Sequence, residues 1–459
     1  MTYIFMVLFL VLSGYVVYFV IQDSDKVLNN SYNKRQDLLA KRVTKGSILS
    51  DNSKVLAETI TDKKGNETRN YPYGGLFAHT VGRISHGKTG LEASEGYTML
   101  TSGIHPFAGM MNRMTGEKDP GNSIVTTLNV TLSQTASNAL GSQKGAVVVM
   151  EPDTGKILAM VSKPTYNPNE LTDAVWKKLT ADSDDDSALY NRATQGLYPP
   201  GSTFKLYTAL QYMRENDTYH KFRFRCSGSI GSGTERIQCY GGEVHGRVNL
   251  TSAFAKSCNV FFCRIGSELN VSAWKSLCES FYYNKSIPLD KLEQKASRFS
   301  IDGNTSKGDL MQASIGQGDT LVSPLQNALL VCAAVNEGTL MKPYLVDRVE
   351  DFAGNVVSEK EPVKLSEPIT SEEAKALKKL MRATVTEGTA TSLLYGNYKA
   401  GGKTGSAEFQ NGSTDSHAWF VGYAEKDKKK LVVSIVVEAA GTGSAYAVPI
   451  AKKIFDAYW

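Results

Sequence analysis

A short segment near the middle of the chain limits the structures and the chemistry that the chain can support. Residues Tyr198–Gly201 read Tyr-Pro-Pro-Gly, and Ser202–Lys205 follow at once as Ser-Thr-Phe-Lys. Pro-Pro-Gly cannot be continued backwards as a helix, so we expect a helix to begin at or just after Ser202. A serine and a lysine three residues apart then lie on one helix face, one turn from each other.

This pairing is suited to nucleophilic catalysis. The serine hydroxyl would lie over free backbone N–H groups at the positive end of the helix dipole. A serine is a poor nucleophile until a base removes its proton, and Lys205 is placed to do so. The same four-residue pattern also arises by chance, in which case the segment is an ordinary amphipathic helix with Lys205 in solvent.

Two further triplets follow in order along the chain, Ser257–Asn259 (Ser-Cys-Asn) and Lys403–Gly405 (Lys-Thr-Gly). Each has a plain structural explanation alone, since an asparagine near a helix start is usually a cap and Lys-Thr-Gly is usually a turn. Together, S-x-x-K, S-x-N and K-T-G are the motif set of β-lactamases and penicillin-binding proteins. The chain therefore resembles the penicillin-binding protein transpeptidases, more narrowly the class B monofunctional type in its short penicillin-binding protein A or division branch.

The resemblance reaches nearly the whole chain. Other segments that match the family pattern are, in chain order, Lys45–Asn52, Arg69–Pro72, His79–Gly82, Gly145–Gly155, Asn191–Gly196, Gly316–Gly318 and Ser323–Gln326. Two positions depart from it, because Lys45 stands where the family has arginine and Ser53 where glycine is common.

The resemblance implies an enzyme with a defined substrate, a peptidoglycan stem peptide that ends in D-Ala-D-Ala. Ser202 would attack the penultimate carbonyl and release D-Ala, and an amine of a neighbouring strand would take the acyl group to form a cross-link. β-Lactam antibiotics would acylate the same serine, and a carboxypeptidase side activity is compatible with this chemistry. The implied catalytic residues are Ser202, Lys205, Ser257 and Asn259, and the implied substrate-binding residues are Lys403, Thr404, Gly405 and Ser406.

Each catalytic residue has an expected role. Lys205 must be neutral to act as a base, so burial and the nearby Lys403 should lower its pKa. Ser257 would relay a proton to the leaving amine. Asn259 would orient Lys205 and the substrate amide.

The remaining residues would bind the substrate. Lys403 and Thr404 would lie on an edge strand and hold the substrate carboxylate. The family pattern implies an oxyanion hole made by the N–H groups of Ser202 and Ser406. No Ser-His-Asp triad is required, and we interpret the chain's histidines, such as His245 and His417, as polar surface or loop residues.

Strand and helix patterns predict an α+β fold. Two β-rich runs, residues 146–150 and 157–162, flank a Pro-Asp-Thr-Gly turn signal, and residues 419–424 and 431–437 form a second such pair. Helical patterns lie between the pairs, for example at Ser371–Thr386, and an amphipathic helix is expected at the end. Strands first, helices next and strands last indicate one antiparallel sheet closed by both ends of a domain. The resemblance implies a five-stranded antiparallel sheet flanked by helices, as in penicillin-binding transpeptidases and serine β-lactamases.

The first residues predict a membrane anchor. Thr2–Ile21 are twenty residues without a charge, long enough to span a bilayer as a helix, and no small-x-small cleavage site follows them. Lys26, Lys34 and Arg35 follow this run and no basic residue precedes it, which by the positive-inside rule alone places the bulk of the chain in the cytoplasm. The motif set instead implies a single-pass protein with its catalytic domain outside the cytoplasm.

We divide the chain into an anchor at residues 2–21, a smaller N-terminal domain at 23–134 and a transpeptidase domain at 135–459. The N-terminal domain carries no catalytic motif, and the resemblance implies a pedestal- or dimerisation-like domain that does not bind penicillin. In class B relatives this region meets a glycosyltransferase of the SEDS family, which makes the strands that are cross-linked. The role in division, elongation or sporulation and the acceptor amine are not readable from the sequence.

Cysteine spacing and charge argue against other ligands. The chain has six cysteines and no C-x-x-C pair, so we expect no metal, and we expect no cofactor. Cys226 and Cys239 flank a turn-rich stretch and either form a disulfide or stay free, whereas Cys258 and Cys263 fit buried thiols. The net charge is only +5 and basic residues do not alternate with aromatics, so nucleic acid is not an expected partner.

Three other functions are weighed against the transpeptidase. A β-lactamase would be shorter and would lack the N-terminal domain. A phosphate-binding loop at Gly401–Thr404 fails because the earlier glycine it needs would fall at Asn397. The third is a β-lactam sensor or a non-catalytic scaffold that activates a cell-wall glycosyltransferase, against which the intact set of Ser202, Lys205, Asn259 and Lys403 argues.

Overall fold

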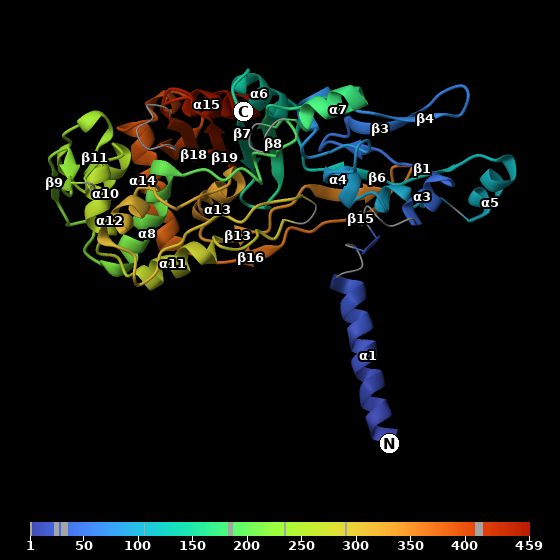
Figure 1. Ribbon diagram of the computed structural model, residues 1–459, viewed down its shortest axis with the longest axis horizontal. Coiled ribbons are helices and arrows are strands. Elements are labelled where there is room, and N and C mark those ends of the chain that lie inside the picture. Colours follow the sequence, from blue (N-terminus) through green and yellow to red (C-terminus); the bar gives the residue numbers. More distant parts are fainter. Residues whose placement is uncertain are drawn as a thin grey trace. The chain divides into compact units, whose positions relative to one another are not determined.

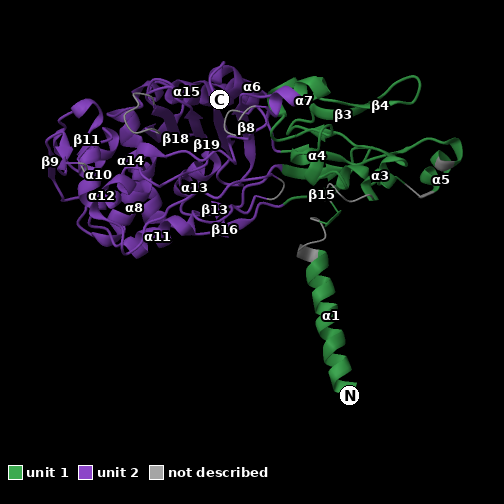
Figure 2. Ribbon diagram, in the orientation of Figure 1, with its two compact units in different colours: residues 1–126, 167–176, 346–360 green, residues 127–166, 177–345, 361–459 purple. Residues whose placement is uncertain are grey.

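The computed structural model describes residues 2–22, 27–28, 35–104, 106–181, 187–233, 236–289, 292–408 and 416–459 of the 459-residue chain. These residues fold into two compact units (Figure 2). Unit 1 consists of Met1–Thr126, Asn167–Trp176 and Val346–Lys360, and unit 2 of Thr127–Tyr166, Lys177–Leu345 and Glu361–Trp459.

The structure moves the domain boundary that we predicted between residues 134 and 135. Helix α6 (Val130–Leu140) runs through that point, and it packs on strand β8 and helix α15 of unit 2. The chain instead crosses between units after β6 (Ser123–Thr126), and β14 (Val346–Glu350) returns to pair with β6. Local sequence patterns could not predict this boundary, because it depends on the pairing of two strands that are far apart in the chain. The predicted start of the domain at Asp23 lies outside the described residues, as do Lys26 and Lys34.

A five-stranded sheet forms the centre of unit 2, in the order β17-β18-β19-β7-β8. Every neighbouring pair is antiparallel, which confirms the predicted sheet. The strands are β17 Lys399–Glu408, β18 Ser416–Lys426, β19 Lys429–Val437, β7 Gly145–Met150 and β8 Ile157–Lys163. Both predicted strand pairs are present, and each joins two strands that are neighbours in the sheet.

Helices cover both faces of this sheet (Figure 1). Side chains of alternate strand residues, such as Val147 and Ile435, form one buried core with α6 and with α15 (Ala447–Tyr458). The opposite face meets α13 (Pro324–Val335), whose Cys332 Sγ lies 4.0 Å from Met150 Sδ. Both strand faces are therefore apolar, and the strands are continuous runs of buried residues.

The other helices of unit 2 extend the molecule beyond the edge strand β17. They are α8 Lys205–Glu215, α9 Leu250–Ala255, α10 Asn259–Gly266, α11 Val271–Ser280, α12 Lys307–Ser314 and α14 Ser371–Thr386, the last as predicted. Helix α14 packs on β17 and α9, whereas α8 packs on α10 and α11. The active-site motifs lie where these helices meet the sheet.

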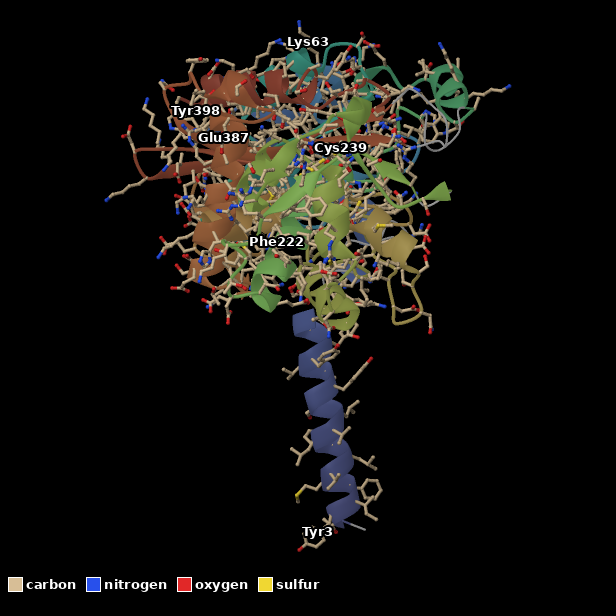
Figure 3. All side chains as sticks on the ribbon, turned by 90° about the vertical axis from the view of Figure 1, so that its left-hand side faces the viewer. Tyr3, Lys63, Phe222, Cys239, Glu387 and Tyr398 are labelled. Carbon is tan, nitrogen blue, oxygen red and sulfur yellow. The ribbon has the colours of Figure 1, made fainter. Side chains whose placement is uncertain are left out.

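Unit 1 contains a six-stranded sheet in the order β15-β14-β6-β2-β3-β4. Its other strands are β2 Ile48–Leu49, β3 Val55–Thr61, β4 Glu67–Asn70 and β15 Val356–Glu359, and its helices are α1 Thr2–Gln22, α3 Arg35–Ala40, α4 Gly90–Ser94 and α5 Pro106–Thr115. The window Thr2–Val20 of α1 is long and apolar enough to cross a membrane, and none of it is buried in the protein (Figure 3).

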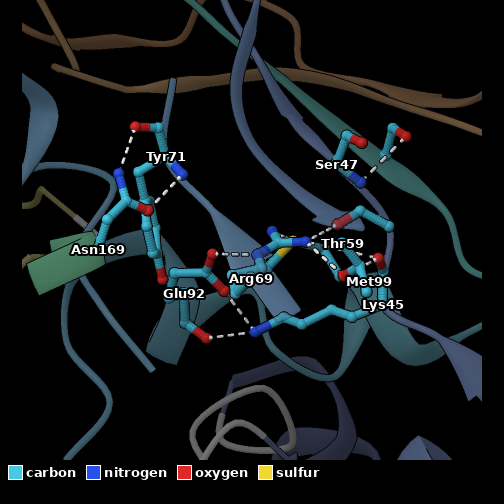
Figure 4. Close-up of polar contacts among 10 residues, drawn as sticks. Lys45, Ser47, Thr59, Arg69, Tyr71, Glu92, Met99 and Asn169 are labelled. Carbon is cyan, nitrogen blue, oxygen red and sulfur yellow. Dashed lines mark hydrogen bonds and ion pairs between the residues drawn. The ribbon is translucent and has the colours of Figure 1, made fainter. Parts of the chain in front are cut away.

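A buried ion network holds unit 1 together (Figure 4). The fully buried carboxylate of Glu92 on α4 pairs with Arg69 Nε at 2.6 Å and with Lys45 Nζ at 2.5 Å. Arg69 also donates to Gly46 O at 2.8 Å and to Thr59 Oγ1 at 3.0 Å. Burial alone would raise the pKa of Glu92, but Lys45 and Arg69 together outweigh this effect. The pKa is therefore lowered, and the carboxylate stays charged.

We predict that Glu92→Gln destabilises unit 1 by about 3–5 kcal/mol, because Lys45 and Arg69 are left without a buried counter-charge. Hydrogen exchange at β3 and β4 measures the loss. The control is Glu67→Gln, which removes a partly exposed pair with Lys118 at 2.8 Å and should cost less than about 1 kcal/mol. Equal effects of the two substitutions would contradict the structural role of the network.

Candidate active site

The candidate nucleophile lies on a tight turn that is fixed on both sides. Gly201 has φ +52°, a left-handed conformation that glycine adopts without strain, and its N–H donates to Gly316 O at 2.9 Å. From the sheet side, Trp419 Nε1 donates to Pro199 O at 3.0 Å. Ser202 follows directly and is partly exposed, so its hydroxyl is accessible while its backbone is held.

The helix begins differently from the prediction. Residues Gly201–Phe204 form a 3₁₀ turn, and the α-helix α8 starts only at Lys205. In a 3₁₀ turn, side chains three residues apart lie directly over each other, which an α-helical start would offset. The tighter turn therefore brings Ser202 and Lys205 into line on one face. Pro-Pro-Gly predicted where the helix starts, but it does not distinguish the two helix types.

Lys205 is fully buried, and hydrogen bonds hold its amine. Its Nζ donates to Ser257 O at 2.8 Å, Asn259 Oδ1 at 2.7 Å and Ser257 Oγ at 3.3 Å, and it lies 5.4 Å from the centre of the Phe262 ring. Within the described ranges no carboxylate forms an ion pair with it. Burial lowers the pKa of Lys205 to about 8, although nearby thiol groups act in the opposite direction.

Ser257 lies between two buried amines. It has φ +58°, and the left-handed turn places its hydroxyl between Lys205 and Lys403, whose Nζ donates to Ser257 Oγ at 2.9 Å. Lys403 also donates to Thr404 O at 3.0 Å and lies 5.6 Å from the Phe254 ring centre. Burial, followed by the charge of Lys205, lowers the pKa of Lys403 well below its ordinary value. Two cations this close in a buried site repel each other, so the pair favours at least one neutral amine.

Asn259 has its amide oriented from two sides. Its Oδ1 accepts from Lys205, and its Nδ2 donates to Gln238 O at 2.9 Å. Gln238 belongs to β11 (Ile237–Gln238), which pairs with β10 (Ser229–Ile230) in a hairpin. The carbonyl of β11 accepts only from the NH₂ group, so the amide oxygen must face Lys205.

The Lys-Thr-Gly-Ser segment runs along the edge strand β17, as predicted, and closely approaches the nucleophile turn. A Cβ on Gly405 would lie 3.0 Å from Pro200 O and 3.2 Å from Thr203 Cγ2. A Cβ on Gly201 would lie 3.1 Å from Ser406 O. A side chain at either position would crowd this approach of the edge strand to the nucleophile turn, so glycine suits both positions.

All eight predicted site residues therefore meet at one place, where η4 (Gly201–Phe204), the start of α10 and β17 converge. Other residues in the site were missed. Thr389 Oγ1 lies 2.5 Å from Thr404 Oγ1, Gln238 fixes Asn259, and Phe254 and Phe262 lie beside the two amines. Gln238 contributes only a carbonyl, which no sequence motif encodes.

The cysteines agree with one of the two alternatives left open by the sequence, whereas the prediction for the histidines is partly wrong. All six cysteines are buried free thiols, as expected for Cys258 and Cys263, and Cys226 and Cys239 form no disulfide. The two histidines that we expected at the surface or in loops have largely buried side chains, although His245 does lie in a loop. His417 lies on β18, where its Nδ1 accepts from Ala439 N–H at 3.2 Å, and the His245 side chain is only 2 % exposed.

The arrangement supports one type of reaction. An accessible serine hydroxyl at a helix start has a buried amine of lowered pKa on the same face, and a hydroxyl links that amine to a second one. This is the pattern of a serine nucleophile activated by a lysine base, with Ser257 as a proton relay. The adjacent edge strand offers backbone donors and the Lys403 amine for a substrate that carries a carboxylate.

Comparisons with known proteins agree with this geometry. A family model described as the penicillin binding protein transpeptidase domain matches residues 145–456. The peptidoglycan D,D-transpeptidase PbpA of Mycolicibacterium smegmatis is 32% identical over 445 residues, 90% of this chain and 88% of the relative. PbpA of Mycobacterium tuberculosis is 29% identical over 90% of this chain and 88% of its own length.

Solved structures resemble this chain over nine-tenths of its length. Penicillin-binding protein A of M. tuberculosis, solved as a ceftriaxone acyl-enzyme, superposes with a TM-score of 0.83 at 28% identity and covers 92% of this chain and 99% of that one. The D,D-transpeptidase domain of a peptidoglycan glycosyltransferase from Eggerthella lenta has a TM-score of 0.81 at 29% identity, with 91% and 98% covered.

Proposed function

The chain belongs to the penicillin-binding protein transpeptidase family, and from this premise we propose that it cross-links peptidoglycan as a serine D,D-transpeptidase. Its relatives are named as peptidoglycan D,D-transpeptidases, and a structural neighbour was solved with β-lactams bound as acyl-enzymes. The observation that carries the proposal is the buried Lys205 amine, which has a lowered pKa and lies on the same helix face as the partly exposed Ser202.

Ser202 attacks the penultimate carbonyl of a stem peptide that ends in D-Ala-D-Ala. Lys205 takes the hydroxyl proton, and Ser257 passes a proton to the leaving amine of D-Ala. The short Lys205–Ser257–Lys403 chain of donors supports this relay. An acceptor amine of a second strand then displaces Ser202, and the same groups act in reverse.

The substrate is held by the edge strand. Lys403 and Thr404 bind the terminal carboxylate, and the N–H groups of Ser202 and Ser406 bind the oxyanion. The close packing of Gly405 on the nucleophile turn supports this role, because it holds the edge strand against the turn that carries Ser202. β-Lactams present a carboxylate and a strained carbonyl with the same spacing, so they acylate Ser202 and stay bound.

We predict that Ser202→Ala abolishes covalent labelling by fluorescent penicillin while the circular dichroism spectrum is unchanged. Ser392→Ala, at an exposed serine of unit 2, should label like the native chain. Persistent labelling of Ser202→Ala would show that another residue is the nucleophile. A native chain that never labels would favour a non-catalytic scaffold.

We predict that the rate of acylation by penicillin rises about tenfold between pH ~7 and ~9 and then levels off, because a base with a pKa of about 8 becomes neutral across that range. Stopped-flow fluorescence measures the rate. Asn259→Asp places an anion beside Lys205, so the profile should move to higher pH. Lys205→Arg should lose on the order of a hundredfold or more at every pH. A flat profile in the native chain would exclude Lys205 as the base.

We further propose that α1 anchors the protein as a single span, with unit 2 on the extracytoplasmic side where peptidoglycan is made. The length of α1, its lack of charge and the absence of buried residues in its window support this role. Unit 1 has no part of the catalytic motifs, and we propose that it is the domain that does not bind penicillin and that meets a SEDS-family glycosyltransferase.

A chain that begins near residue 23 should be soluble and bind penicillin normally, yet fail to replace the full-length protein in cells. Replacing Thr2–Ile21 with an unrelated single-span anchor tests whether α1 has a role besides anchoring. If cells with the exchanged anchor grow normally, α1 acts only as an anchor. Normal growth supported by the soluble chain at native abundance would disprove both the anchor and the partner proposals.

A further inference from the structure

A cluster of metal-ligand side chains lies beside the active site and has no part in the proposed reaction. Cys226, Cys239, His245 and Cys258 each offer one ligand atom, and these atoms all lie within 4.8 Å of one another. The three cysteines are at most 2 % exposed, and the His245 side chain is 2 % exposed. Figure 3 labels Cys239, which comes directly after β11.

Three of the distances between these atoms fit the edges of a tetrahedron, and the other pairs lie within 4.8 Å. Cys226 Sγ lies 3.7 Å from Cys239 Sγ and 3.6 Å from His245 Nδ1, and Cys239 Sγ lies 3.9 Å from Cys258 Sγ. Zn–S bonds of roughly 2.3 Å and Zn–N bonds of about 2.05 Å in tetrahedral geometry give S···S distances of about 3.8 Å and S···N distances of about 3.6 Å. These three distances therefore match a zinc site, whereas a disulfide would need sulfurs roughly 2.05 Å apart.

The surroundings also suit ionised thiols and a fixed imidazole. The N–H groups of Gly228 and Phe261 point at Cys226 Sγ and Cys258 Sγ, each at 3.4 Å. With Nδ1 turned towards Cys226, His245 Nε2 lies 3.5 Å from Glu243 Oε2. A carboxylate at the outer nitrogen is the usual way in which a histidine ligand is held with its inner nitrogen free for the metal.

We propose that Cys226, Cys239, His245 and Cys258 bind one structural Zn²⁺ ion. Three thiolates and an imidazole in a closed tetrahedron favour zinc, and no position is left open for catalysis at the metal. Each coordinating thiol gives its proton to solvent on binding. This proposal departs from our expectation of no metal, which rested on the absence of a C-x-x-C pair.

The ligands come from four separate segments, so the metal joins them. Cys226 ends β9 (Phe224–Cys226), His245 immediately precedes β12 (Gly246–Val248), and Cys258 caps α10. Strands β9 and β12 pair, which brings Cys226 and His245 together. The spacing of twelve, five and twelve residues between ligands in the sequence follows no common zinc motif.

The site also has a consequence for catalysis, and this part rests on the proposed function. Cys258 is the middle residue of the S-x-N motif, and Gln238, which fixes the Asn259 amide, precedes Cys239. The ion would therefore hold Ser257 and Asn259 in register with Lys205 through their chain neighbours. These four ligands are positioning residues, since none of them touches the reacting atoms.

The test measures zinc per chain in full-length protein purified in detergent with reductant. We expect about one equivalent by mass spectrometry of the metal, and after replacement by Co²⁺ we expect the thiolate charge-transfer bands of a tetrahedral site. Cys226→Ser and Cys239→Ser should lose the ion. Cys278→Ser and Cys332→Ser, at buried cysteines outside the cluster, should keep it. A native chain that stays free of zinc when Zn²⁺ is supplied, or a Cys226–Cys239 disulfide found by peptide mapping, would overturn the site.

A second measurement covers variants that fail to fold. Chelation of the native chain should increase hydrogen exchange in residues 224–248 and at the start of α10, and added Zn²⁺ should reverse the change. Unchanged exchange after the metal is removed would exclude the structural role. Ser202→Ala should keep the full zinc content, so failure of the catalytic assignment and failure of the metal site give separate results.

Discussion

The active site depends on two buried lysine amines that form no ion pair with any carboxylate of the described residues. Lys205 and Lys403 both donate to Ser257, and burial lowers the pKa of each. A carboxylate beside them would stabilise the charged amines and remove the base that the serine needs. The surroundings instead offer hydroxyl, amide and carbonyl oxygens and two aromatic rings, which hold an amine without fixing its charge.

Keeping these amines in place requires a rigid frame, and the five-stranded sheet provides it. Strand β17 carries Lys403 at the sheet edge, and glycines at Gly405 and Gly201 let it pack directly on the nucleophile turn. The Trp419 ring on the next strand holds the turn by its bond to Pro199. Helix α8 packs on α10 behind the turn, and the side chains of Lys205 and Lys403 are fully buried, so a site built from three distant segments keeps its hydrogen-bond geometry.

Much of this arrangement could be predicted from the sequence. Pro-Pro-Gly marked a helix start, and the apolar runs around residues 146–162 and 419–437 marked the strands, because these signals are local. The resemblance then identified Ser257, Asn259 and Lys403 as partners of Lys205. Local patterns failed where distant segments meet. The pairing of β14 with β6 moved the domain boundary, the choice of 3₁₀ over α geometry depended on contacts of Gly201, and the thiol and imidazole of the cluster come from segments with no common motif.

The S-x-N motif connects the two lysine amines of the active site with the cluster of thiols and imidazole. Ser257 faces the amines, Cys258 faces the thiol cluster, and Asn259 bonds to both Lys205 and the carbonyl of Gln238. Three successive residues thus connect the reactive centre with a hairpin that has only short strands and little apolar packing of its own. Such a hairpin holds its register weakly. A tetrahedral metal at its base would supply the missing constraint, and the position of Asn259 would then depend on a bond network outside the catalytic motifs.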